Sequence, residues 1–240
     1  MASYITRLKK REEVAAGTMA FHWEKPFGFN FKPGHFISLT LIDPPETDAE
    51  GNVRAFSIAS APYEDDLMIA TRMRDTAFKR TIKTLTLGAE IQIQGPFGSL
   101  TLHDDSTRPA TLVAGGIGIT PFRSILLQAA EKRLLHHLFL FYSNRRPGDA
   151  AFFAELEKLE KINPNYKFVP TMTDRSESGS QWRGESGYID KNMLAKFITN
   201  LAEPIYYVAG PPAMVKAMKT LSSDTGVKED NIRAEEFAGY

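Results

Sequence analysis

Short runs of β-branched and aromatic residues, separated by polar turns, fill the first hundred positions of the chain. Turn sequences such as Lys32-Pro33-Gly34 and Asp43-Pro44-Pro45 mark the ends of these runs. Several short strands at this spacing are typical of an antiparallel barrel. The strands that the pattern predicts are 18–23, 36–41, 54–60, 67–72 and 90–94, with one more near Tyr4.

From residue 110 onward the pattern changes to apolar strands that are each followed by a helix. Such repeated strand–helix units indicate a mainly parallel sheet that is covered on both faces. The predicted pairs are 110–114 with 121–132, 137–142 with 151–161, 167–173 with 190–200, and 205–209 with 212–222, and a last strand is expected over 232–237.

Polar residues and a proline interrupt the pattern at 103–109, which marks a domain boundary. The chain therefore predicts a two-domain fold. We expect an N-terminal six-stranded antiparallel β-barrel over residues 1–104 and a C-terminal α/β domain with a Rossmann-like parallel sheet over residues 105–240. A polar loop is expected over 174–185.

Composition narrows the classes of function. Lys and Arg number 29, as do Asp and Glu, so no uniform basic field attracts nucleic acid or an anionic membrane. No apolar stretch reaches the roughly 18 residues of a membrane helix, and no signal-like run opens the sequence, so a cytoplasmic protein is expected. The absence of cysteine excludes thiol catalysis and Cys-ligated iron–sulfur clusters within these residues, and the scattered histidines predict no metal site.

A glycine-rich segment, Gly115-Gly116-Ile117-Gly118-Ile119-Thr120-Pro121, follows an apolar strand and precedes a helix. Glycines there let the backbone approach a pyrophosphate, and the free N–H groups of the first helical turn attract anions. The segment differs from the usual Gly-x-Gly-x-x-Gly fingerprint and lacks the Lys-Ser/Thr ending of a nucleoside-triphosphate loop. It predicts a dinucleotide site, with a structural tight turn as the alternative.

A second segment, Arg54-Ala55-Phe56-Ser57, lies on a predicted barrel strand. The planar guanidinium of Arg54 can pair with phosphate oxygens, Phe56 offers an apolar face to a ring, and the Ser57 hydroxyl can donate and accept. Alternate residues of a strand point to the same face, so Arg54 and Phe56 can contact one ligand. Taken alone, a surface arginine beside a core phenylalanine is the simpler interpretation.

The order of the two segments along the chain decides between these interpretations. Together they resemble the ferredoxin–NADP⁺ reductase-like family of flavoproteins, whose flavin-site pattern is Arg-x-Tyr/Phe-Ser/Thr. The resemblance spans nearly the whole chain. Further motifs of that family are matched by Pro33-Gly34-His35-Phe36, Gly95-Pro96-Phe97-Gly98, the segment from Gly115 to Pro121, and Gly210-Pro211-Pro212-Ala213-Met214.

The resemblance implies an FAD-binding barrel over 1–104 and an NAD(P)H-binding domain over 105–240. Arg54 would hold the FAD pyrophosphate, Phe56 would pack on the isoalloxazine or ribityl group, and Ser57 would lie near flavin N5, which accepts the hydride. The implied flavin-side residues are Arg54, Ala55, Phe56, Ser57, Thr71, Arg72, Met73, Phe78, Lys79, Arg80 and Thr81. The implied nicotinamide-side residues are Gly115, Gly116, Ile117, Gly118, Thr120, Pro121, Ser143, Arg145, Asp174, Gly210, Pro211, Pro212 and Met214.

The chain departs from the family pattern in ways that matter for the cofactor. Phe56 stands where tyrosine is commoner, so a hydroxyl that could bond the ribityl chain is lost. The segment 75–81 lacks a glycine often seen there, which leaves FMN open beside FAD. Ala209 stands where many members carry cysteine, so no thiol assists hydride transfer here.

Tyr240 is the second catalytic candidate beside Ser57. In some relatives a terminal aromatic covers the flavin and swings aside for nicotinamide, which implies a gating, cofactor-contacting role for Tyr240. A frayed tail is the alternative. Glu236 is a weaker candidate, as a proton carrier.

The sequence slightly favours NADH over NADPH as the hydride donor. Asp174, at the end of a predicted strand, could accept hydrogen bonds from ribose hydroxyls and would repel a 2′-phosphate. Arg145, Arg146 and Arg175 could instead neutralise that phosphate, and Asp174 could simply be a turn residue.

The sequence therefore predicts an FAD-dependent oxidoreductase that passes a hydride from NAD(P)H to bound flavin and electrons to a separate acceptor. Such an acceptor could be a ferredoxin, a haem protein or an oxygenase component. A flavin reductase that uses flavin as substrate is one alternative, which retention of flavin through gel filtration would exclude. A non-catalytic flavin- or nucleotide-binding subunit is another, which reduction of the flavin by a nicotinamide would exclude.

Overall fold

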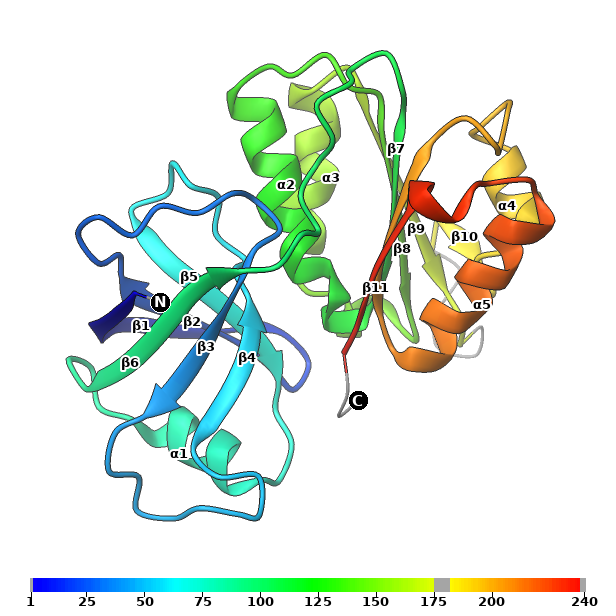
Figure 1. Ribbon diagram of the computed structural model, residues 1–240. Helices are drawn as coiled ribbons and strands as arrows, with labels where there is room; N and C mark the ends of the chain where they lie inside the picture. Colours follow the sequence, from blue (N-terminus) through cyan, green and yellow to red (C-terminus); the bar gives the residue numbers. More distant parts are fainter. Residues whose placement is uncertain (1, 175–181, 238–240) are drawn as a thin grey trace.

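Two sheets, one antiparallel and one parallel, form the frame of the molecule (Figure 1). The computed structural model describes residues 2–174 and 182–237. The antiparallel sheet ends at Phe97 and the parallel sheet begins at Ala110, with an irregular connection between them. This arrangement confirms the predicted fold class.

The antiparallel sheet curls into a barrel because its outermost strands, β4 and β5, are in contact. Helix α1 (Ala77–Thr84) connects β5 to β6. The strands are β1 (Ser3–Ala15), β2 (Thr18–Glu24), β3 (Phe36–Leu41), β4 (Val53–Ser57), β5 (Asp66–Arg72) and β6 (Glu90–Phe97), and they lie in the order β4-β3-β6-β1-β2-β5.

Apolar side chains at alternate positions of the strands fill the interior of this barrel. On β3, Ile37, Leu39 and Leu41 are buried, whereas the residues between them are half-buried. Successive side chains of a strand point to opposite faces, so this period places every second residue in the core. The same interior holds Phe21, Trp23 and other apolar side chains of β1, β2, β5 and β6.

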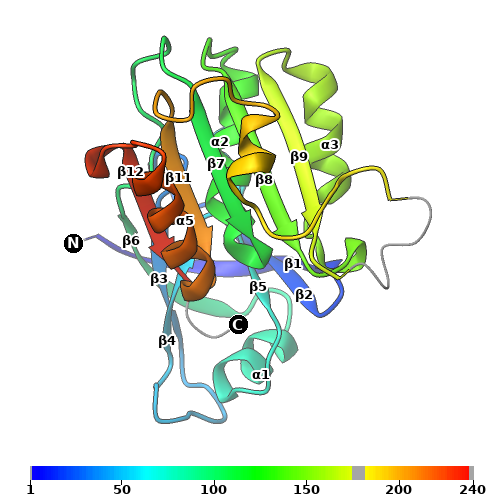
Figure 2. The same cartoon turned by 90° about the vertical axis from the view of Figure 1, so that its right-hand side faces the viewer.

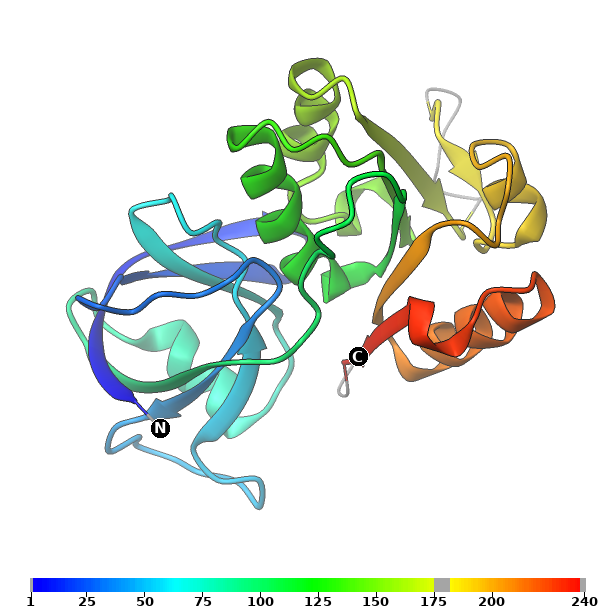
Figure 3. The same ribbon diagram turned by 45° about the horizontal axis from the view of Figure 1, so that its top comes forward.

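The parallel sheet has helices on both faces (Figures 2 and 3). Helices α2 and α3 cover the face toward the barrel, and α4 and α5 cover the other. The strands are β7 (Ala110–Gly115), β8 (Leu138–Asn144), β9 (Tyr166–Met172), β10 (Glu185–Ser186), β11 (Ile205–Gly210) and β12 (Ile232–Glu236), in the order β10-β9-β8-β7-β11-β12. The helices are α2 (Ile119–Glu131), α3 (Phe153–Ile162), α4 (Lys191–Ala195) and α5 (Pro212–Asp224), with short 3-10 turns at Gly116–Gly118, Pro147–Asp149 and Glu229–Asn231.

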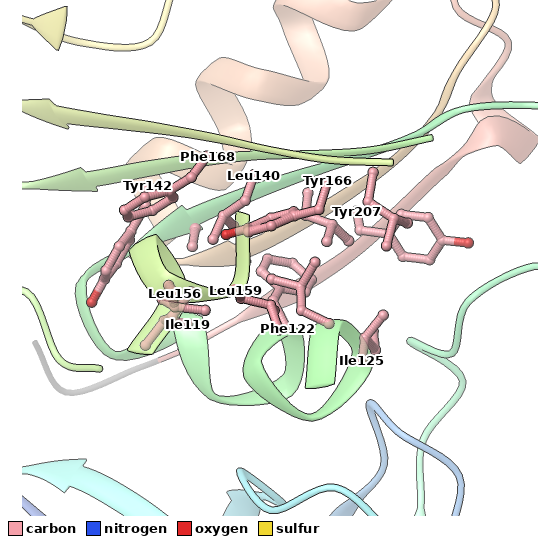
Figure 4. Close-up of a cluster of buried hydrophobic side chains, with 14 of the residues drawn as sticks. Ile119, Phe122, Ile125, Leu140, Tyr142, Leu156, Leu159, Tyr166, Phe168 and Tyr207 are labelled. Carbon is pink, nitrogen blue, oxygen red and sulfur yellow. The ribbon is translucent and has the colours of Figure 1, made fainter. Parts of the chain in front are cut away.

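Neighbouring strand residues supply two separate cores, one on each face of this sheet. Leu112 packs with α2 and α3, whereas Val113 packs with α4 and α5. Figure 4 shows the first of these cores, with Phe122 of α2 directed at the aromatic side chains of the sheet. Strands buried on both faces are expected to be continuously apolar, as these are.

The structure differs from the expected elements in three places. β1 has 13 residues because its first half pairs with β6 and its second half with β2. The helix expected over 190–200 ends at Ala195, since Phe197 turns in to meet the ring of Phe141 at 5.8 Å. Part of the expected polar loop forms β10, a two-residue strand beside β9. No helix in the described ranges is long and apolar enough to cross a bilayer.

A buried arginine on α2 joins the two domains. Arg123 is 6% exposed and lies between Glu64 of the barrel domain and Glu155 of α3. Its Nη atoms donate to Glu64 at 2.9 and 3.1 Å, and its Nε and Nη2 donate to Glu155 at 2.6 and 2.7 Å. A further bond, 2.8 Å long, reaches the backbone carbonyl of Ala59 in the barrel domain.

We expect Arg123→Met to lower the free energy of unfolding by about 2 kcal/mol, because Glu64 and Glu155, which are 28% and 38% exposed, lose their shared partner and are only partly hydrated. Urea and thermal unfolding measure the loss. Lys132→Met, at the exposed end of the same helix, removes the same charge and serves as the control. Equal stability of the two variants would contradict a structural role for the ion pairs of Arg123.

Candidate functional site

A cleft of about 790 Å³ lies where the carboxyl ends of the parallel strands face the barrel. Gly115 ends β7, Ser143 lies near the end of β8, and Pro211 follows β11. In open α/β sheets this edge is where ligands bind. Arg72 and Arg74 of the barrel domain supply the facing wall. The lining includes the predicted residues Arg72, Gly115, Gly116, Ser143, Arg145, Pro211 and Met214.

Two glycines bring the ends of β7 and β11 close together. A Cβ on Gly210, which has a φ of +155°, would lie 3.0 Å from the backbone nitrogen of Gly115. A Cβ on Gly115 would lie 2.6 Å from the sulfur of Met214 and 2.9 Å from Pro211. Larger residues would therefore close the floor of the cleft, which fits the predicted approach of a backbone to a pyrophosphate.

Gly118 and Thr120 lie deeper than the sequence suggested. A Cβ on Gly118 would lie 2.1 Å from the backbone oxygen of Ala209, so this glycine is required by packing against β11. Thr120 is 2% exposed, and its hydroxyl donates to the carbonyl of Ile117 at 3.1 Å. Both residues shape the turn that carries Gly115 and Gly116; neither is among the residues that line the cleft.

Three of the predicted flavin-side residues gather at the start of α1. The rings of Phe56 and Phe78 are 5.8 Å apart, and the guanidinium of Arg54 lies over the Phe78 ring at 5.1 Å. Thr76 caps the helix by accepting from the backbone nitrogen of Lys79 at 3.3 Å. The strand β4 and the helix α1 thus place an arginine, two rings and a helix N-terminus together.

Arg54 is already bonded within its own loop. Its Nη1 donates to the carbonyls of Glu50, Gly51 and Val53 at 2.8–3.0 Å. Its Nη2 donates to Asp48 at 2.9 Å and lies 3.1 Å from the carboxylate of Glu50. A ligand phosphate that takes hold of Arg54 through Nη2 must therefore exchange with these carboxylates.

Lys79 provides a second cation beside Arg54. Its ammonium donates to the carbonyl of Arg72 at 2.6 Å, and no carboxylate of the described residues forms an ion pair with it. Burial, followed by repulsion from Arg74 and Arg54, lowers the pKa of Lys79 below its usual value. A half-buried cation among cations is stabilised by an anion. This part of the chain therefore fits a phosphate-bearing cofactor.

The remaining predicted residues divide between the core and the surface. Ser57, Thr71 and Thr81 are buried, with exposed fractions of 8%, 6% and 4%, whereas Ala55 and Arg80 are exposed. Arg80 bonds Glu46 and Asp75. Met73 donates its backbone N–H to the carbonyl of Gly17.

Asp174, the predicted donor selector, lies beside the cleft. Its carboxylate is 3.7 Å from Arg146, and its neighbour Thr173 lines the cleft. Tyr240 lies outside the described residues. No group of His, Asp and Glu side chains in the described ranges is placed to hold a metal ion.

The structure adds residues that the sequence alone did not single out. Arg74 and Tyr188 line the cleft, and Tyr188 is 82% exposed there. On β12, the carboxylate of Glu235 approaches the barrel, since a Cβ on Gly98 would lie 3.7 Å from its Oε1. Burial raises the pKa of Glu235 to about 7. The sequence offered a weak signal only: two adjacent acids, of which Glu236 is the exposed one.

Comparison with known proteins gives matches over both domains. The family described as "Oxidoreductase NAD-binding domain" matches residues 112–220. Terephthalate 1,2-dioxygenase reductase component 1 of Comamonas sp is 27% identical over 87% of this chain and 60% of its own length. The NAD(P)H-flavin reductase of Aliivibrio fischeri is 26% identical over 97% of both chains. The chain thus spans about 60% of the length of several curated relatives it matches.

A solved structure agrees in fold. The ferredoxin NADP⁺ reductase from Neisseria gonorrhoeae, determined with bound FAD and NADP, has a TM-score of 0.79 and 22% identity, with 98% of each chain covered. At this identity the likeness concerns the fold.

Glu235 should make stability depend on pH in a defined direction. Its pKa of about 7 in the folded protein lies above the ordinary 4.5, so folding favours the protonated carboxyl. The stability that this preference contributes is full below the unfolded pKa and is lost as pH rises through the folded pKa. Glu235→Gln should remove this loss.

Melting temperatures measured between about pH 5 and 8 test the expectation. The wild type should lose stability relative to Glu235→Gln as pH rises. Glu236→Gln, at the exposed neighbouring position, should follow the wild type. Parallel profiles for wild type and Glu235→Gln would show that the folded protein does not hold this proton.

Proposed function

We propose that this chain, which is similar to flavoprotein reductases of the ferredoxin–NADP⁺ reductase-like family, transfers a hydride from NAD(P)H to FAD and passes electrons to a separate acceptor. The observation that carries this proposal is the position of the cleft. One wall comes from the barrel domain through Arg72 and Arg74, and the other comes from the carboxyl ends of the parallel strands.

The barrel domain supplies the groups that suit the flavin. Arg54 and Lys79 would hold phosphate oxygens, and Phe56 would pack against the ring system or the ribityl chain. Ser57, the last residue of β4, would lie near flavin N5, as the resemblance to this family implies. The bound flavin supplies the redox chemistry, since it accepts two electrons as a hydride and releases them singly or together.

The α/β domain supplies the groups that suit the nicotinamide cofactor. The backbone of Gly115 and Gly116 would approach its pyrophosphate at the start of α2. Met214 and Pro211 close the floor of the cleft beneath this segment. The residues of the chain then act mainly by alignment, because holding donor and acceptor in a productive geometry removes most of the entropic barrier.

The electron acceptor is proposed from the relatives. Several of them are named as reductase components or subunits of dioxygenases and monooxygenases. We propose a separate oxygenase component, ferredoxin or haem protein as the acceptor for this chain. With no cysteine among its 240 residues, this chain cannot itself hold a Cys-ligated iron–sulfur relay.

A second candidate function is a flavin reductase that uses flavin as a substrate. Two observations favour it: the match to the NAD(P)H-flavin reductase covers 97% of both chains, and Arg54 is bonded to its own loop. Weak retention of FAD on gel filtration, together with turnover of added flavin, would decide for this candidate.

Flavin binding tests the barrel assignment. We expect Arg54→Ala to weaken FAD binding by roughly tenfold or more, because a charged hydrogen bond contributes about 1.5 to 3 kcal/mol. Fluorescence titration of flavin-free protein measures the affinity. Arg7→Ala, on an exposed part of β1, is the control and should bind FAD as the wild type does. A wild type that binds neither FAD nor FMN would overturn the proposed function.

The choice of donor tests Asp174. We propose a modest preference for NADH, since a carboxylate near the ribose repels a 2′-phosphate. The ratio of kcat/KM for NADH over NADPH should exceed one and should fall in Asp174→Ser. Asp104→Ser, in the exposed connection between the sheets, should leave the ratio unchanged. An unchanged ratio in Asp174→Ser, or a wild-type ratio below one, would remove Asp174 as the selector.

A further inference from the structure

An acidic loop covers Arg54, one of the two cations that the proposed function assigns to the flavin phosphates. This acidic loop, residues 42–52, connects β3 to β4. Its Glu46 bonds Arg80, and its Asp48 and Glu50 bond Arg54. Although the whole chain has no net charge, three carboxylates contact two arginines at one end of the barrel.

Asp48 holds the guanidinium that the proposed function assigns to a flavin phosphate. Its Oδ1 accepts from Arg54 Nη2 at 2.9 Å. Burial opposes its ionisation, but hydrogen bonds from Arg54 and from the backbone amides of Glu50 and Ala77 outweigh burial and lower the pKa of Asp48. Ala77 is the first residue of α1, and its backbone amide helps to lower the pKa of Asp48, so the carboxylate lies close to a helix N-terminus as well as to Arg54. Phosphates bind to the same pair of donors.

Asp48 and Glu50 already occupy Nη2 of Arg54, one of the two nitrogens through which the guanidinium fork can hold an anion by two parallel bonds. Its Nη1 is engaged by three backbone carbonyls of the acidic loop and β4, so a two-point grip on an external anion falls to Nη2 together with Nε. That Nη2 is the atom that Asp48 holds. A phosphate that binds Arg54 through this atom must displace the carboxylate.

We propose that Asp48 is a specificity-determining residue, which competes with the phosphate groups of flavin nucleotides for Arg54. The inference rests on the proposed flavin site of the barrel. Asp48 reduces the gain in affinity that phosphate gives FMN and FAD over riboflavin. The phosphate-bearing end of the flavin is therefore bound weakly, and bound flavin exchanges with free flavin. Lys79 still attracts phosphate, because its ammonium bonds a backbone carbonyl and forms no ion pair with a carboxylate of the described residues.

A purely architectural role of Asp48 predicts something different. Its Oδ1 also accepts from the backbone nitrogen of Glu50 at 3.0 Å, and its carbonyl accepts from Gly51 at 2.9 Å, as in an ordinary turn. A turn role would affect all flavins alike. Competition for a phosphate position affects only flavins that carry phosphate.

The test compares the affinities of riboflavin, FMN and FAD for flavin-free full-length protein, by quenching of flavin fluorescence. In Asp48→Asn we expect FMN and FAD to bind about five- to tenfold more tightly, with riboflavin unchanged within about twofold, since a competing charged hydrogen bond is removed. Asp43→Asn is the matched control: it removes the same charge from the same loop, and Asp43 is not among the partners of Arg54. It should leave all three affinities unchanged.

A second variant separates the loss of the charge from a disturbance of the fold of the acidic loop. Asp48→Ser retains a side chain that accepts a turn hydrogen bond while it removes the charge. It should shift the same two ligands in the same direction. An unchanged or weaker binding of FMN and FAD in both variants, or an equal gain for riboflavin, would overturn the inference. A wild type that binds none of the three flavins would instead overturn the proposed function.

Discussion

The position of Arg123 between the two domains governs how the walls of the cleft face each other. All the nitrogens of its guanidinium donate to partners: two carboxylates and a backbone carbonyl, drawn from the barrel domain and from α3. The side chain also lies over the ring of Phe152 at 5.1 Å. A buried arginine that lost both carboxylates would be left as an uncompensated charge, which favours the arrangement of the domains that keeps these contacts. Ser124, the next residue of α2, adds a bond to the carbonyl of Ser60 at 2.7 Å.

The chain has no net charge, but a local group of cations lies near the cleft and suits its proposed anionic ligands. Arg54, Arg74 and Lys79 lie near one another, and repulsion among them contributes to the lowered pKa of Lys79. The acidic loop balances part of this charge from one side, while the other side faces the cleft through Arg74. A cation group that is only partly neutralised attracts anionic ligands and still allows them to leave. This balance links the fold of the β3–β4 loop to the exchange of cofactors.

The sequence predicted the parts of the site that depend on local patterns. Strand periodicity located β3 and β11 to within a residue, and the glycines of the segment after β7 pointed to the edge of the sheet where the cleft lies. It also grouped Arg54 and Phe56, which the structure places around Phe78.

Contacts between distant segments were beyond such patterns. Arg123 sits in an apolar helix, and nothing in its neighbourhood along the chain names Glu64 as its partner across the domain boundary. Gly118 was expected to face a ligand, but the backbone of β11 lies where a Cβ would be. Asp48 could not be connected to α1 without knowing how the β3–β4 loop folds back on the barrel. Pairings of this kind arise from tertiary packing and are invisible to local propensity.

The central claim is that a nicotinamide bound at the carboxyl ends of the parallel strands delivers its hydride to a flavin bound by the barrel of the same chain. An anaerobic titration of the purified, flavin-loaded protein with NADH and with NADPH tests it most directly. The account predicts that the absorbance of oxidised flavin disappears after about one equivalent of nicotinamide, because one hydride carries both electrons. Flavin that stays oxidised with excess of both nicotinamides would contradict the account.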